Sequence, residues 1–152
     1  MVELTYYDTW YKGSLDLHKS IGILVLLTFI ARLAWRMINI NPDSADANAT
    51  KFEIKSAHWV HIALYILMAV LFLTGFLIST ADGRAIAVFD VFSVPALPFS
   101  VDNQEDIAGE IHEILAWSLV LLAGVHGLAA LKHHFINKNQ TLVRMLRVTK
   151  QK

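Results

Sequence analysis

HIALYILMAVLFLTGFLI, residues 61–78, contains no Asp, Glu, Lys or Arg. A helix needs about 20 predominantly apolar residues to cross the roughly 30 Å hydrocarbon layer of a membrane. A helix in a soluble bundle would instead keep a charged stripe along its water-facing side. Because this stretch has no such stripe, it predicts a membrane-spanning helix.

Two further stretches have the same character. Residues 114–131, ILAWSLVLLAGVHGLAAL, are also uncharged, and residues 21–30 contain Thr28 as their one polar side chain. We therefore expect an all-α, integral membrane helical bundle that forms a single domain over residues 1–152. The expected spans are residues 16–38, 58–80 and 109–135.

The composition excludes several classes of protein. The chain has no cysteine, which excludes disulfides, cysteine-bound iron–sulfur clusters and haem attached covalently through cysteine. Its formal net charge is zero, so no general attraction to nucleic acid is expected. Membrane lipid is the partner that the composition does predict.

The distribution of charge predicts an orientation. The tail 136–152 contains Lys and Arg but no Asp or Glu, and Arg32 and Arg36 end the first span. Loops rich in Lys and Arg face the cytoplasm, so we expect a multi-pass membrane protein with a cytoplasmic C-terminal tail. The loop 81–110 has six acidic residues and only Arg84 as a cation, which places it outside.

This orientation also puts the segment 1–17 outside, although it is short and has no signal-peptide pattern. A span that precedes it would explain this. We therefore expect the natural bundle to have four up-and-down helices, of which this chain supplies three.

Histidines are the candidate functional residues, because an ionisable group at membrane depth is costly and is usually functional. His112 and His126 are fourteen residues apart, close to four helical turns, so they share one face of the third span about 21 Å apart. That separation suits two stacked haem groups rather than one shared metal ion. The sequence contains His18, His58, His61, His112, His126, His133 and His134.

Membrane depth suggests the pairs. His18 and His112 each lie in the opening turn of a span that starts outside, so we expect them to bind one haem iron from opposite sides. His126 needs a partner near the inner side, which is either His61 or a histidine of the absent span. We therefore expect His18, His112 and His126 to bind iron, and His61 to be a further cofactor-binding candidate.

The other residues near these sites have ordinary alternative roles. His133 and His134 suit the membrane interface, and Arg32 and Arg36 either set the topology or pair with haem propionates or a quinone head group. Glycines flank the histidines, which suits either a flat macrocycle or helix packing.

Ordered motifs resemble the bacterial cytochrome b561 family from about Tyr6 to Arg147. The segments Leu17–Gly22 and Ala31–Arg36 resemble its second span, and Ala57–His61 the start of its third. The motifs Glu110-Ile-His-Glu113, Gly124-Val-His-Gly127 and Lys132–Phe135 resemble its fourth, and Thr141–Met145 its tail.

The resemblance implies a four-helix, di-haem b-type cytochrome of the bacterial inner membrane that exchanges electrons with quinone. Family members include superoxide oxidases that reduce ubiquinone. In the family, residues that match His18 and His112 bind one haem. The residue that matches His126 binds the other, together with a first-span histidine, and nothing before Tyr6 resembles that span.

Three functions compete at this point. The first is electron transfer through one or two haem b groups to or from quinone in the respiratory chain, which would make the chain an oxidoreductase and includes superoxide:quinone oxidoreductase. The second is a cytochrome b anchor subunit of a dehydrogenase or hydrogenase, which requires a redox partner protein. The third, a metal transporter, would need carboxylates near the membrane midplane, and the spans have none there.

Overall fold

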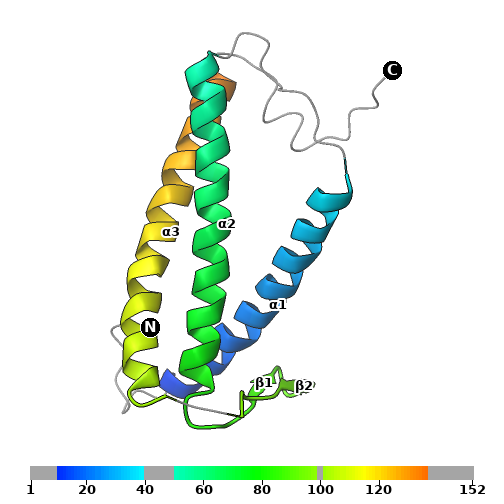
Figure 1. Cartoon of the computed structure of the whole chain (residues 1–152), viewed down its shortest axis with the longest axis vertical. Coiled ribbons are helices and arrows are strands. Elements are labelled where there is room, and N and C mark those ends of the chain that lie inside the picture. Colours follow the sequence, from blue (N-terminus) through cyan, green and yellow to red (C-terminus); the bar gives the residue numbers. More distant parts are fainter. Residues whose placement is uncertain (1–9, 40–49, 99–100, 137–152) are drawn as a thin grey trace. The chain divides into compact units, whose positions relative to one another are not determined.

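The computed structural model describes residues 10–39, 50–98 and 101–136. The expected outer segment before residue 10 and the basic tail from residue 137 lie outside these ranges. The elements are α1 (Tyr11–Ile38), α2 (Lys51–Ser79), β1 (Ile86–Val88), β2 (Phe92–Val94) and α3 (Gln104–Phe135) (Figure 1).

The three helices confirm the expected all-α membrane architecture. Each is long and apolar enough to cross a membrane. An α-helix satisfies its backbone hydrogen bonds within itself, which is required in hydrocarbon. Large apolar side chains such as Trp117, Val120 and Leu121 of α3 are exposed, an arrangement that suits lipid and not water.

Polar turns extend the helices beyond the apolar stretches. α2 begins at Lys51, seven residues before the expected span. A capping box starts it: the Glu53 carboxylate accepts hydrogen bonds from the backbone N–H and the hydroxyl of Thr50, each 2.8 Å long. The Glu53 N–H donates to Thr50 Oγ1 in return, at 3.3 Å.

We expect Thr50→Ala to weaken the start of α2. The substitution removes the side-chain acceptor of the Glu53 N–H, which typically costs about 1 kcal/mol. Unfolding of the purified protein in mixed detergent micelles, followed by circular dichroism, would measure the loss. Thr50→Ser keeps the acceptor and should unfold like the parent chain; equal losses in both variants would contradict the capping role.

Residues between α2 and α3 form a short antiparallel hairpin, which the sequence analysis did not predict. Ile86 pairs with Val94, and Val88 pairs with Phe92. The turn has positive φ at Phe89 (48°) and Asp90 (56°), without the Asn-Gly or Asp-Gly pair that usually marks such turns. Ile86 and Val88 are buried, so β1 turns one apolar face inward.

A tight turn connects α2 to this hairpin. Gly83 has a φ of +77°, which favours glycine, and its N–H donates to the Thr80 carbonyl at 3.0 Å. Asp82 forms an ion pair with Arg84 beside it. The hydrogen bond from the Arg84 side chain lowers the pKa of Asp82, but both groups are exposed, so the pair contributes little stability.

The described residues fall into two compact units. The first contains α1, α2 from Val70, the hairpin and α3 up to Ile114. The second contains α2 up to Ala69 and α3 from Leu115.

Contacts of several kinds join the elements of the first unit. The rings of Phe29 and Phe72 pack with their centres 5.5 Å apart. The Gln104 amide donates to the Leu77 carbonyl at 2.9 Å, which ties the start of α3 to the end of α2. The hairpin, which lies beside the start of α1 in Figure 1, donates the Phe89 N–H to the buried Ser20 hydroxyl at 3.1 Å.

Candidate functional site

His18 of α1 and His112 of α3 come together in the first unit. Their ring centres are 6.2 Å apart and their planes are inclined at 79°. The two residues are 94 positions apart in the sequence (112 − 18), so the fold alone brings them together. The sequence analysis expected these two histidines to meet because they lie at the same membrane depth, and in the structure they lie side by side.

A cavity of about 260 Å³ adjoins both rings. Its walls are mainly apolar, with Lys19 as the charged exception. No atom lies within 4 Å of a Cβ built on Gly22, so that glycine leaves open space on the α1 wall. The lining residues are His18, Lys19, Ile21, Gly22, Ile23, Val25, Leu26, Leu71, Phe72, Gly75, Phe76, Ser79, Ile86 and His112.

The His112 ring rests against α2. Its Nδ1 lies 3.0 Å from the Thr74 hydroxyl oxygen. A Cβ added to Gly75 would lie 3.0 Å from Cε1 and 3.4 Å from Nδ1 of the same ring. Because Gly75 has no side chain, the His112 ring can lie close against α2.

We expect Gly75→Ala to destabilise the first unit, because the added methyl would push the His112 ring aside. Overpacking of this kind costs about 1–3 kcal/mol. Gly13→Ala is the matched control, since nothing lies within 4 Å of the added atom on α1. Unfolding in mixed micelles should show a loss only at position 75; equal stability of both variants would refute the close contact.

The site can be tested for its fit to haem. A metal–nitrogen bond is about 2 Å long and the nitrogen lies about 1 Å from its ring centre, so a metal between two imidazoles separates the ring centres by roughly 6 Å. His18 and His112 match that separation at 6.2 Å. With the apolar cavity and the open wall at Gly22, these residues fit a haem held by two axial histidines.

His61 and His126 meet in the second unit, between α2 and α3. Their ring centres are 5.0 Å apart, with the planes inclined at 72°. That distance is shorter than the roughly 6 Å that a metal between two rings needs. His61, one of the two partners considered for His126, therefore lies beside it. The two rings are in direct contact and leave no room for a metal between them.

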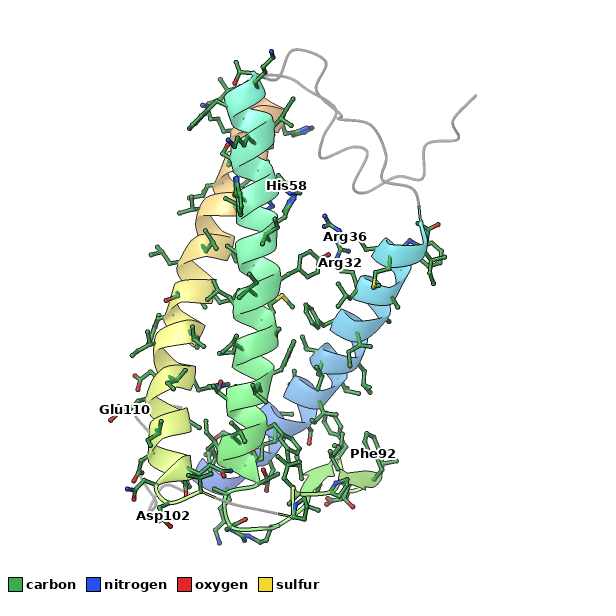
Figure 2. The ribbon with its side chains drawn as sticks, in the orientation of Figure 1. Arg32, Arg36, His58, Phe92, Asp102 and Glu110 are labelled. Atoms are coloured by element: carbon green, nitrogen blue, oxygen red, sulfur yellow. The ribbon has the colours of Figure 1, made fainter. Side chains whose placement is uncertain are left out.

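The other candidates lie elsewhere. The ring of His58 packs on Trp59, and that of His134 packs on Phe135. Arg32 and Arg36 lie near the end of α1 (Figure 2). None of these residues lines the cavity beside His18 and His112.

Sequence reasoning missed Thr74 and Gly75. The signal was present as a threonine and a glycine side by side within an otherwise apolar stretch. A polar and a small residue at membrane depth are typical of close helix contacts and interhelical hydrogen bonds. Thr74 and Gly75 could therefore have been recognised as a site of helix contact. Their contact with His112 could not, because His112 belongs to another helix.

A family model described as prokaryotic cytochrome b561 matches residues 1–147. The chain belongs to the prokaryotic cytochrome b561 family. The resemblance drawn from the histidine motifs is thereby confirmed, and membership implies a b-type haem and electron transfer in a bacterial membrane.

Curated relatives agree with this membership. Cytochrome b561 homolog 2 of Escherichia coli (strain K12) is 47% identical over 146 residues, which cover 96% of this chain and 77% of the relative. Cytochrome b561 homolog 1 of the same strain is 32% identical over 86% of this chain and 73% of its own length. The "Probable superoxide oxidase CybB" of Yersinia pestis is 27% identical over 92% of this chain and 77% of its own length.

Proposed function

We propose that this b561-family chain transfers electrons between a b-type haem, bound by His18 and His112, and quinone in the bacterial inner membrane. The observation that carries the proposal is the 6.2 Å spacing of the two rings beside an apolar cavity. The family supplies the expectation of haem, and the spacing supplies the candidate ligands.

The two imidazoles suit electron transfer rather than oxygen binding. When bound, haem supplies one-electron redox chemistry. If His18 and His112 both held the haem iron, no coordination position would remain for dioxygen. The apolar walls formed by residues such as Leu26, Phe72 and Ile86 exclude water from the site and so reduce the reorganisation that accompanies a change of charge.

We expect His18→Leu and His112→Leu each to abolish the same b-type haem signal, because either variant leaves one axial position empty. Reduced-minus-oxidised spectra of purified protein, with the pyridine haemochrome as a count of haem, would measure it. His58→Leu is the matched control, since its ring packs on Trp59 outside the cavity. Loss of two different signals from the two variants would contradict the pairing.

His126 is proposed as a ligand of a second haem. Two partners remain open for it: His61, which would have to move outward from the present 5.0 Å contact, or a histidine supplied by a helix outside residues 1–152. Counting haem in His61→Leu and His126→Leu would separate these alternatives.

We also propose that the His18 and His112 end of the protein faces outward and that the C-terminal tail is cytoplasmic. Arg32 and Arg36 at the end of α1 support this orientation, because Lys and Arg accumulate on the cytoplasmic side. At the other end, Asp102 and Glu110 lie at the start of α3 (Figure 2), in a region with few cations.

Quinone is the proposed redox partner, and superoxide is one candidate donor. The support for superoxide is the name of one relative, "Probable superoxide oxidase CybB". Its approach would be opposed by the acidic outer loop, although Arg84 offsets the charge of Asp82. Electrostatic opposition slows an encounter between like charges but leaves the electron-transfer step itself unchanged.

We expect a short-chain ubiquinol to reduce the haem of the purified, oxidised protein under anaerobic conditions. A rapid-mixing experiment would follow the haem bands, and the reverse reaction would use chemically reduced protein with ubiquinone. A superoxide-generating system, with and without superoxide dismutase, tests the other donor. Failure of electron exchange with quinone in both directions would contradict the proposed partner.

A further inference from the structure

We propose that Thr74 is a positioning residue that selects the nitrogen of His112 available to iron. The inference rests on the proposed function, in which His112 is an axial ligand. It concerns the tautomer and the basicity of that ligand, which nothing in family membership determines.

The hydroxyl of Thr74 lies within hydrogen-bond distance of three groups. Its hydroxyl oxygen lies 3.0 Å from the carbonyl oxygens of Val70 and Leu71, and 3.0 Å from His112 Nδ1. Carbonyl oxygens can only accept, and with two of them within reach we assign the single hydroxyl hydrogen to the backbone of α2. In this assignment the hydroxyl oxygen accepts a hydrogen bond from His112 Nδ1–H.

This direction sets the tautomer of the imidazole. A neutral ring that carries its proton on Nδ1 has its lone pair on Nε2. Thr74 is only 5% exposed, so water does not compete for its hydroxyl. Nε2 is thus the nitrogen left free to bind a metal.

Gly75 lets the ring lie close against α2. The ring atoms Cε1 and Nδ1 lie 3.0 and 3.4 Å from the place where a Cβ would be at position 75. The imidazole consequently lies close against α2 while its Nδ1 bonds to the neighbouring Thr74. The two adjacent residues act together, one on the orientation of the ring and the other on its proton.

The hydrogen bond also changes the electronic character of the ligand. An acceptor on the N–H opposite the metal raises the basicity of the coordinating nitrogen. A more basic ligand stabilises ferric iron over ferrous iron and lowers the midpoint potential. Removing the acceptor should therefore shift the potential to more positive values.

The test compares three variants of the haem-loaded protein. Thr74→Val keeps the shape of the side chain and removes the hydroxyl, and Thr74→Ser keeps the hydroxyl. Thr80→Val is the matched control, because the buried Thr80 hydroxyl donates to the Phe76 carbonyl at 2.8 Å and is not the partner of His112. Potentiometric titration and the low-spin electron paramagnetic resonance signal are the readouts.

We expect Thr74→Val to shift the midpoint potential of this haem upward and to change its resonance signal. Thr74→Ser should restore both, and Thr80→Val should change neither. An unchanged or more negative potential in Thr74→Val would overturn the proposal. If the valine variant does not accumulate, Thr74→Ala removes the same hydroxyl and is judged by the same readouts.

A measurement on the unsubstituted protein tests the tautomer directly. Nitrogen-15 resonances of labelled histidine in the reduced protein should show His112 protonated at Nδ1. Protonation at the other nitrogen, with Nδ1 bound to iron, would overturn the proposal. The proposed function fails separately, through retention of the haem signal in His112→Leu.

Discussion

An imidazole inside a membrane span must find a partner for its N–H group, because hydrocarbon offers none and an unsatisfied polar group is costly there. In the first unit His112 Nδ1 lies 3.0 Å from the Thr74 hydroxyl, which is itself bonded to the backbone of α2. This chain of hydrogen bonds joins α3 to α2, while His18 brings α1 beside the same ring. The cavity and the contact at Gly75 depend on where this bond places His112.

The features that follow from solvent preference could be predicted from the sequence. Long apolar stretches have one stable form in lipid, the helix, so the three spans were evident without any tertiary information. The meeting of His18 and His112 was also predictable, because two spans that start on the same side of a membrane place their opening turns at similar depth. The depth of each residue in the membrane can be read from the sequence, and residues at the same depth can meet. A soluble protein offers no such guide to contacts between distant residues.

Features that depend on helix rotation, on helix separation or on very short strands could not be predicted from the sequence. The place of Thr74 opposite His112 depends on the rotation of α2 relative to α3, to within a fraction of a turn, which no property of α2 alone determines. The hairpin was not predicted because three-residue strands are too short to show an alternation of apolar and polar residues. Its turn residues, Phe89 and Asp90, also differ from the Asn-Gly or Asp-Gly pairs that usually mark a hairpin turn. The 5.0 Å contact between His61 and His126 likewise depends on helix separation, which hydropathy does not report.

The hairpin requires the connection after α2 to deliver β1 in one register. Side chains on a strand alternate between two faces, so a shift of one residue exchanges them. Ile86 and Val88 face inward, and Ile86 forms part of the cavity wall. A shift of the strand by one residue would bring Ala85 and Ala87 into those two positions, and a shift by two would bring the charged Arg84 into the position of Ile86. Either shift would remove apolar bulk from the cavity wall, so changes in the length of this connection must leave the register of β1 unchanged.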